Sequence, residues 1–311
     1  MDQAGRPQPA HLLTAGRSAS DGTPERAGAE STRSGPVASQ SVSTAPPPPN
    51  HVLAAFGGDA AALEPLAGGR GITFRCGDIV FKPVDQPAEA AWLAGVFEQL
   101  RVVGIRVARP IRSSDGRWVV AGWSAQRFVS GRPEPRHSQI IQVSLDLHEA
   151  LAGVPEPRIL RDRDDIYSVA DRLSWGETPM EALQLGDGHG ARLMAELASG
   201  RRASALARQV VHGDMFGNVL FAGNAPPAVI DIAPYWRPPA WAAAVIAVDS
   251  ISWGGAQTDL LEEWAHLPEW PQMLRRALMF RLGLSLAHPR TTASSLVEVL
   301  TAADVIRPFL D

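Results

Sequence analysis

Short runs of mainly apolar residues separated by glycines predict strands in the first half of the chain. Such runs lie at 63–67, 72–75 and 79–82, and two more follow at 117–121 and 124–129. Short runs bounded by turn residues are typical of strands joined by tight turns. We therefore expect a sheet built from these segments.

A helical pattern interrupts the strands between residues 88 and 100. Its apolar residues recur every three or four positions, and Pro87 stands directly before it. Proline is favoured at the first helical position because the N–H group that it lacks has no intrahelical partner there. The first part of the chain is therefore expected to combine a sheet with one helix.

The second half of the chain is mainly helical by the same criterion, apart from a β-like segment at 210–232. The segments with helical spacing are 139–151, 167–173, 191–197 and the stretch that contains Trp270, Leu274, Leu278 and Leu282. Strands followed by helices indicate an α+β fold. We expect a strand-rich lobe over 51–131 and a helical lobe over 132–311.

Residues 1–50 differ from the rest of the chain. They contain no aromatic residue, are rich in Ser, Thr, Pro, Gly, Ala and Gln, and end close to the four prolines at 46–49. Such a segment buries too little apolar surface to offset the entropy lost on ordering, so we expect a disordered tail.

The composition excludes several classes of partner. A net charge of −4 and a pI near 6.1 give no basic surface for nucleic acid or an anionic membrane. The single cysteine, Cys76, leaves no intrachain disulfide and no cysteine-rich metal site. No signal peptide and no apolar run of membrane-spanning length is apparent, so a cytoplasmic location is expected. The oligomeric state is not predicted.

Lys82 is the only lysine in the chain, and all other members of its Lys and Arg total of 29 are arginine. Lysine presents a compact ammonium group, whereas arginine presents a broad planar guanidinium group. The compact ammonium group suits a tight phosphate pocket better than a guanidinium group does, so Lys82 is a candidate phosphate contact.

The β-like segment carries the strongest chemical signal. One apolar run leads into His212, Gly213 and Asp214, Asn218 follows, and a second apolar run ends at Asp231. A hairpin would bring the two carboxylates and the carboxamide together. Phosphoryl transfer needs one carboxylate near the attacking hydroxyl and oxygen ligands for Mg²⁺.

These residues resemble the His-Gly-Asp, Asn and strand-borne Asp of the aminoglycoside phosphotransferase family, which is itself similar to protein kinases. The similar motif order runs from about residue 63 to 252. The resemblance implies a two-lobed protein-kinase-like fold, with a small antiparallel sheet and one helix in the N-terminal lobe and a larger helical C-terminal lobe. It also implies ATP and Mg²⁺ as cofactors.

The resemblance assigns roles by position. Asp214 would be the catalytic base, with His212 ordering its loop through hydrogen bonds, and Asn218 and Asp231 would bind magnesium. Lys82 would contact phosphate and would be fixed by Glu89. The remaining nucleotide contacts would be the glycine-rich loop and the hinge, namely Gly68, Gly69, Gly71, Phe128 and Val129.

Two departures from the family pattern are visible. Only three residues separate Asp214 from Asn218, where the family has four, and Gly217 is the one that permits unusual backbone angles. Asp231 is not followed by the usual Gly-Asp-Pro, and Asp249 is expected to brace the catalytic loop from a helix. An actinobacterial subgroup of the family is similar in this respect.

The leading hypothesis is an ATP- and Mg²⁺-dependent phosphotransferase acting on a hydroxyl of a small molecule such as an antibiotic or a sugar. A polycationic acceptor would require clustered carboxylates, for which the candidates are Asp164, Asp165, Glu177, Glu262 and Glu263. The alternative is a nucleotide-binding pseudokinase or scaffold without phosphotransfer. A protein Ser/Thr kinase is disfavoured because His-Arg-Asp, Asp-Phe-Gly and Ala-Pro-Glu are missing.

Overall fold

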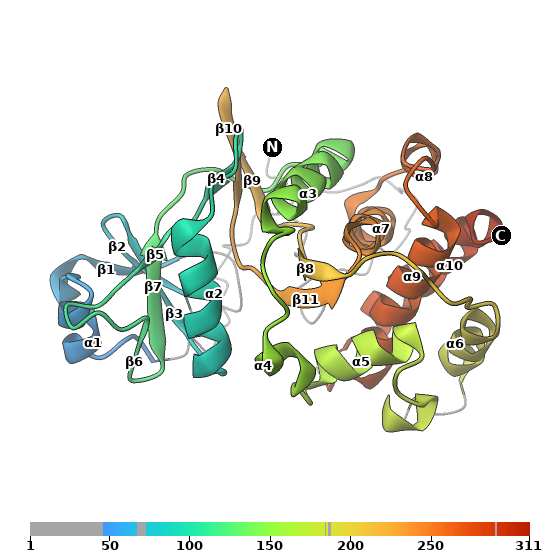
Figure 1. Cartoon of the computed structure of the whole chain (residues 1–311), viewed down its shortest axis with the longest axis horizontal. Coiled ribbons are helices and arrows are strands. Elements are labelled where there is room, and N and C mark those ends of the chain that lie inside the picture. The colour runs from blue at the N-terminus through green and yellow to red at the C-terminus, as the bar shows by residue number, and fades with distance from the viewer. Residues whose placement is uncertain (1–45, 67–72, 184, 186–187, 290) are drawn as a thin grey trace, which may run out of the picture.

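The computed structural model describes residues 46–66, 73–183, 185, 188–289 and 291–311, and it has the predicted α+β architecture (Figure 1). A strand-rich lobe lies beside a larger helical lobe. The α-helices are α1 (Asn50–Ala55), α2 (Pro87–Gln99), α3 (His137–Leu151), α4 (Arg158–Arg161), α5 (Ile166–Trp175), α6 (His189–Ser199), α7 (Pro239–Asp249), α8 (Asp259–Glu263), α9 (Trp270–Ala287) and α10 (Ala293–Ile306). The strands are β1 (Leu63–Pro65), β2 (Phe74–Cys76), β3 (Ile79–Pro83), β4 (Arg106–Val107), β5 (Pro110–Ile111), β6 (Val119–Val120), β7 (Trp123–Arg127), β8 (Gln209–His212), β9 (Val219–Ala222), β10 (Ala225–Val229) and β11 (Pro234–Arg237).

The main sheet is antiparallel, in the order β1-β2-β3-β7-β5, with β6 paired to β7. Successive side chains of a strand point to opposite faces. Phe81 of β3 therefore packs on α1, where its ring meets Phe56 with centroids 6.1 Å apart. Its neighbour Lys82 points to the other face, on the side of α2 and the helical lobe.

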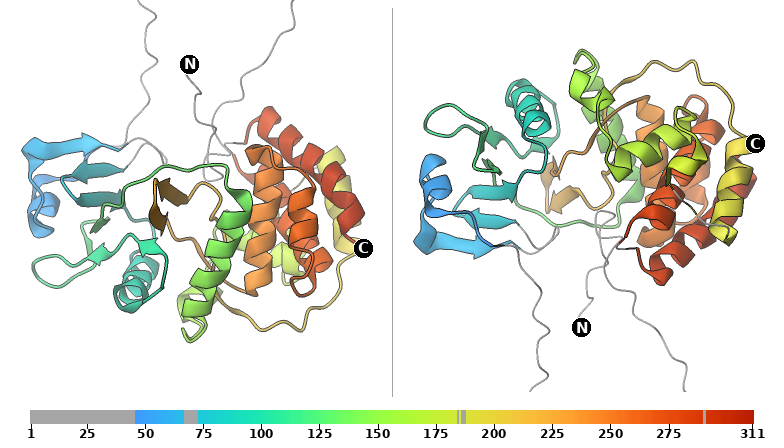
Figure 2. Two further views of the ribbon diagram at one scale, coloured as in Figure 1. Left: turned by 90° about the horizontal axis from the view of Figure 1, so that it is seen from above. Right: turned by 90° about the horizontal axis from the view of Figure 1, so that it is seen from below.

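Two smaller sheets lie between the main sheet and the helices. The hairpin of β9 and β10 also pairs in parallel with β4, and β8 pairs antiparallel with β11. Figure 2 shows the hairpin between the strand-rich lobe and the helices. The pairing of β4 with β10 joins a strand from before residue 131 to one from after it. The lobe boundary expected between residues 131 and 132 therefore stays a prediction.

Helices α7 and α9 form the centre of the helical lobe and pack against each other. Residues 240–249 of α7 are all buried, as expected for a helix that is apolar on every side. Residues 273–285 of α9 are also buried, including three arginines. None of the described helices is long and apolar enough to cross a membrane.

The predicted elements agree with the structure, with some differences in extent. Helices α2, α3, α5, α6 and α9 and strands β1, β2, β3, β6 and β7 each overlap a predicted segment. β7 ends at Arg127, so Phe128 and Val129 lie beyond the strand. The tail prediction falls almost wholly outside the described residues, although α1 begins at Asn50.

Candidate active site

A cavity of about 510 Å³ lies where α2 and the strand-rich lobe meet the helical lobe. This volume is typical of a site for a small ligand. Lys82 of β3, Asp214 of the loop after β8 and Asp231 after β10 all line it. Three side chains that are far apart in the sequence therefore share one cavity, as the motif order predicts.

Lys82 forms an ion pair with Asp231. The side chain of Lys82 is largely buried, at 21% exposure, and burial lowers its pKa to about 8. Asp231 has a left-handed backbone conformation, with φ of 51°. Non-glycine residues adopt that conformation at a cost and are enriched at functional sites when they do.

Glu89 does not pair with Lys82, so that sequence-based expectation is wrong. Its Oε2 lies 3.6 Å from Nη1 of Arg163, while Lys82 bonds to Asp231. Glu89 projects from the first turn of α2 into the same cavity, and burial raises its pKa. The pairing differs because Arg163, just before α5, reaches α2 from the helical lobe.

His212 orders the loop that carries Asp214. Its Nδ1 accepts hydrogen bonds from the backbone N–H groups of Asp214, at 3.2 Å, and Ala233, at 3.3 Å. A ring nitrogen that accepts is unprotonated, so Nε2 carries the hydrogen and faces the carbonyl oxygen of Ile230 at 3.4 Å. Burial lowers the pKa of His212 to about 4, which keeps the ring neutral.

A second buried histidine, His148 of α3, was not identified from the sequence. Its Nε2 accepts the backbone N–H of His212 at 2.9 Å, and its Nδ1 lies 3.3 Å from the hydroxyl of Ser144. Burial lowers its pKa to about 3. His148 lies 64 residues before His212, so no local pattern connects the two.

Arg281 of α9 contacts Asp214 directly. Its Nη2 donates to Asp214 Oδ1 at 2.7 Å, and its Nε donates to Asp249 Oδ1 at 2.7 Å. Asp249, the last residue of α7, is fully buried, and Arg281 is 3% exposed. Asp249 therefore contacts the loop only indirectly, through Arg281, which bonds to both Asp249 and Asp214. The role of Arg281 was not predicted from the sequence.

The shortened loop still places Asn218 beside Asp231. The N–H of Asn218 donates to the carbonyl of Met215 at 2.9 Å, and Gly217 has φ of 81°, so the turn closes through its left-handed glycine. The N–H of Ile230, next to Asp231, donates to the carbonyl of Asn218 at 3.0 Å. The two candidate metal ligands thus belong to hydrogen-bonded neighbouring segments.

The donor atoms of Asn218 and Asp231 fit a magnesium ion. Asn218 Nδ2 donates to the Asp214 carbonyl at 2.6 Å, whereas the buried Oδ1 has no hydrogen-bond partner among the described residues. An unpaired buried oxygen is a donor that suits a hard cation such as Mg²⁺, although Asn218 is not among the described residues that line the cavity. No group of three His, Cys, Asp or Glu that could hold a metal occurs within the described ranges.

The structure says less about the remaining nucleotide contacts. Gly68, Gly69 and Gly71 lie outside the described residues. Phe128 and Val129 are not among the described residues that line the cavity, and the guanidinium of Arg75 covers the ring of Phe128 at 3.7 Å. Gln126 of β7 does line it.

Several solved structures of small-molecule kinases and phosphotransferases share this fold. A microcompartment-associated aminopropanol kinase is 18% identical with a TM-score of 0.51, over 74% of this chain and 85% of that chain. A choline/ethanolamine kinase family protein from Mesorhizobium loti is 17% identical with a TM-score of 0.52, over 82% and 90%. A thermostable mutant of the aminoglycoside phosphotransferase APH(4)-Ia, in ternary complex with ADP and hygromycin B, is 12% identical with a TM-score of 0.55, over 83% and 97%.

No family model and no curated protein matches the sequence. Identities this low show a common fold and nothing finer. They confirm the expected α+β fold, with an antiparallel sheet and a helical part, which this chain shares with these small-molecule kinases and phosphotransferases.

Proposed function

We propose that this protein transfers the terminal phosphoryl group of ATP to a hydroxyl of a small molecule, in a Mg²⁺-dependent reaction. The observation that supports this most strongly is the shared cavity of Lys82, Asp214 and Asp231. Phosphoryl transfer depends mainly on positioning and on neutralising phosphate charge, and these three side chains supply the groups for both tasks.

Each side chain has a distinct role in the proposed reaction. Lys82 exchanges its contact with Asp231 for the nucleotide phosphates, to which its compact ammonium group is suited. Asp231 and Asn218 Oδ1 would hold Mg²⁺, which neutralises charge on the β- and γ-phosphates when it is bound. Asp214 accepts the proton of the attacking hydroxyl. The hydroxyl oxygen of the acceptor then bonds to the γ-phosphorus while the bond from that phosphorus to the β-phosphate oxygen breaks, and ADP is released.

The structural neighbours are compatible with an alcohol acceptor. Their names specify an aminopropanol kinase, a choline/ethanolamine kinase family protein and a phosphotransferase bound to hygromycin B. The acceptor of this chain is therefore proposed to be a hydroxylated small molecule.

One observation favours nucleotide binding without transfer as a second candidate. Asp214 Oδ1 is already occupied by Arg281, which leaves one carboxylate oxygen for an acceptor hydroxyl. One oxygen is sufficient to orient a hydroxyl, but the contact with Arg281 restricts how an acceptor can approach the carboxylate. The two functions differ in whether ATP is turned over.

The variant Asp214→Asn distinguishes phosphotransfer from nucleotide binding without transfer. We expect the wild type to consume ATP with one or more members of a panel of hydroxylated metabolites and antibiotics, and the variant to lose about 10²–10⁴-fold in kcat. Asp164→Asn is the control, because Asp164 is exposed and is not among the described cavity-lining residues. Binding of Mg²⁺ with a non-hydrolysable ATP analogue should persist in both. Binding without turnover in the wild type would favour the second candidate.

A further inference from the structure

Two buried hydroxyl groups in the cavity wall lack a hydrogen-bond partner among the described residues. Tyr235 of β11 is 7% exposed, Ser285 of α9 is 4% exposed, and both line the cavity. Neither hydroxyl forms a hydrogen bond with another described residue. Buried hydroxyl groups of proteins are nearly always paired, so two unpaired ones in a single cavity point to a ligand that pairs with them.

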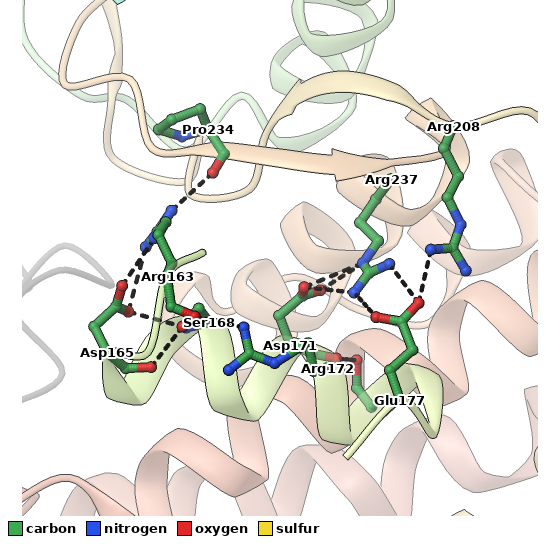
Figure 3. Close-up of polar contacts among 10 residues, drawn as sticks. Arg163, Asp165, Ser168, Asp171, Arg172, Glu177, Arg208, Pro234 and Arg237 are labelled. Carbon is green, nitrogen blue, oxygen red and sulfur yellow. Dashed lines mark hydrogen bonds and ion pairs between the residues drawn. The ribbon is translucent and has the colours of Figure 1, made fainter. Parts of the chain in front are cut away.

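The strand that carries Tyr235 is anchored on both sides of it. The carbonyl of Pro234 accepts a hydrogen bond from Arg163 Nη1 at 3.0 Å, and Arg237 pairs with the buried Asp171 at 2.7 Å (Figure 3). Side chains on rigid elements hold their polar groups in one place before a ligand arrives. The position of Tyr235 in the cavity wall is therefore fixed by its neighbours in β11.

Two of the carboxylates considered for a polycationic acceptor belong to the same anchors. Asp165 pairs with Arg163 at 2.8 Å, and Glu177 pairs with Arg237 at 2.7 Å (Figure 3). Both therefore help to hold the strand that carries Tyr235. The other three candidates are exposed and are not among the described residues that line the cavity, namely Asp164, Glu262 and Glu263.

The ring of Tyr235 lies beside the candidate catalytic residue. It packs over Gly213, which directly precedes Asp214, and a Cβ atom at Gly213 would collide with the ring. Edge contacts with Trp241 and Phe280, at centroid separations of 5.4 and 5.6 Å, orient the ring further. Burial raises the pKa of Tyr235, so its hydroxyl keeps the proton and can donate a hydrogen bond.

Ser285 approaches the same carboxylate from α9. It follows Arg281 by four residues, so the two side chains lie on one face of the helix. Arg281 Nη2 donates to Asp214 Oδ1 at 2.7 Å. The cavity therefore has one unpaired hydroxyl on β11 and another on α9, and each is connected to Asp214 through one neighbouring residue.

We infer that Tyr235 and Ser285 bind the acceptor, and that the acceptor is a polyhydroxylated molecule. One of its hydroxyls reacts at Asp214, and others pair with Tyr235 and Ser285. A hydroxyl group both donates and accepts hydrogen bonds, so a polyol matches two side chains that do the same. An alcohol with a single hydroxyl would leave both side chains unpaired in the complex, which costs affinity. The inference rests on the proposed function for the transfer step, whereas the binding of a polyol does not.

The first experiment compares ligands that share a ring but differ in their hydroxyl groups. myo-Inositol is compared with cyclohexanol, and glucose with tetrahydropyran-2-methanol, within a panel of sugars and cyclitols that are each paired with a monohydroxy counterpart. Binding is measured by calorimetry with Mg²⁺ and a non-hydrolysable ATP analogue present, so that the result does not depend on turnover. We expect at least one polyol to bind about tenfold more tightly than its counterpart.

Two variants remove one hydroxyl each. Tyr235→Phe and Ser285→Ala should each weaken binding of the tightest-binding polyol about three- to tenfold, the loss typical of one hydrogen bond between neutral groups. Both should bind the ATP analogue as the wild type does. Ser294→Ala is the control for polyol binding, because Ser294 is exposed on α10 and is not among the described cavity-lining residues.

Unfolding without ligand distinguishes a binding role from a structural one. Neither Tyr235→Phe nor Ser285→Ala breaks a hydrogen bond of the free protein, so neither should lower the midpoint of denaturant unfolding. Ser113→Ala should lower it, because the buried hydroxyl of Ser113 donates to Asp115 Oδ1 at 2.6 Å and accepts the N–H of Arg117 at 3.0 Å.

Three results would overturn the inference. The first is a panel in which no polyol binds more tightly than its monohydroxy counterpart, and the second is wild-type affinity for the polyol in both variants. The third is a loss of stability in Tyr235→Phe or Ser285→Ala as large as that in Ser113→Ala, since the hydroxyl would then be paired in the free protein. Polyol binding that meets every expectation, without consumption of ATP, would instead refute the phosphotransfer proposal and leave the polyol site in place.

Discussion

Two successive hydrogen bonds to histidine rings hold the loop that carries Asp214. His148 accepts the N–H of His212, and His212 in turn accepts the N–H of Asp214. Both rings must be neutral on the accepting nitrogen, and burial keeps them so by lowering the pKa values to about 3 and about 4. We therefore expect the position of the loop that carries Asp214 to depend on pH.

This coupling predicts a loss of stability in mild acid. The unfolded chain has histidine pKa values near 6.5, so below that pH it binds more protons than the folded protein. The free energy of unfolding should fall as the pH decreases from 6.5 towards 4, by up to about 1.4 kcal/mol per pH unit for each histidine.

Denaturant unfolding of His148→Gln between pH 7 and pH 5 checks this. The variant should show a shallower dependence of unfolding free energy on pH than the wild type, while His51→Gln, at an exposed position outside the site, should not. Identical slopes in all three proteins would show that His148 is not the source.

Single residues differ in how far the sequence reveals them. Lys82 was identified because it is the only lysine of the chain, and Asp214 and Asp231 because each follows an apolar strand. Arg163 and Arg281 were missed because nearly every basic residue here is arginine, which gives neither position a distinguishing signal. The partner of Glu89 was predicted wrongly for the same reason.

At the scale of elements, the turn between β8 and β9 depends on Gly217. Its φ of 81° allows three residues to span the distance from Asp214 to Asn218. Gly223, in the turn between β9 and β10, has φ of 52° and lies away from the candidate metal ligands. The two glycines share the left-handed backbone conformation but differ in their distance from the candidate metal ligands, so Gly223 serves as the control for Gly217.

Substitution of either glycine by alanine should cost about 1–2 kcal/mol of stability, because L residues adopt a left-handed conformation at that cost. Only Gly217→Ala should also raise the Mg²⁺ concentration needed for nucleotide binding, since it displaces Asn218. The comparison is made by denaturant unfolding and by nucleotide titration at several Mg²⁺ concentrations. An equal effect of both variants on the Mg²⁺ requirement would contradict the role given to Asn218.

Elements with strong periodicity were predictable and those defined by tertiary contacts were not. The helix at Pro87–Gln99 was evident from its apolar spacing and its proline. Strand β4, two residues long, exists because it pairs with β10 across more than 100 residues, and β11 exists because it pairs with β8. Long-range pairing of this kind has no local sequence signal.

At the scale of the whole molecule, the order of the motifs was sufficient to predict the fold. The predicted fold requires the lysine on its strand, the helix that follows and the His-Gly-Asp hairpin to meet at one cavity. Residues of all three line the same cavity in the structure. The charge pattern of the cavity was not predictable, because it depends on which arginine meets which carboxylate after folding.

A crystal structure with Mg²⁺ and the non-hydrolysable analogue AMP-PNP tests the central proposal most directly. The account predicts the ion bound by Asp231 and Asn218 Oδ1, Lys82 in contact with the phosphates in place of Asp231, and the γ-phosphate facing Asp214. A nucleotide bound elsewhere, with the pair of Lys82 and Asp231 intact, would contradict it.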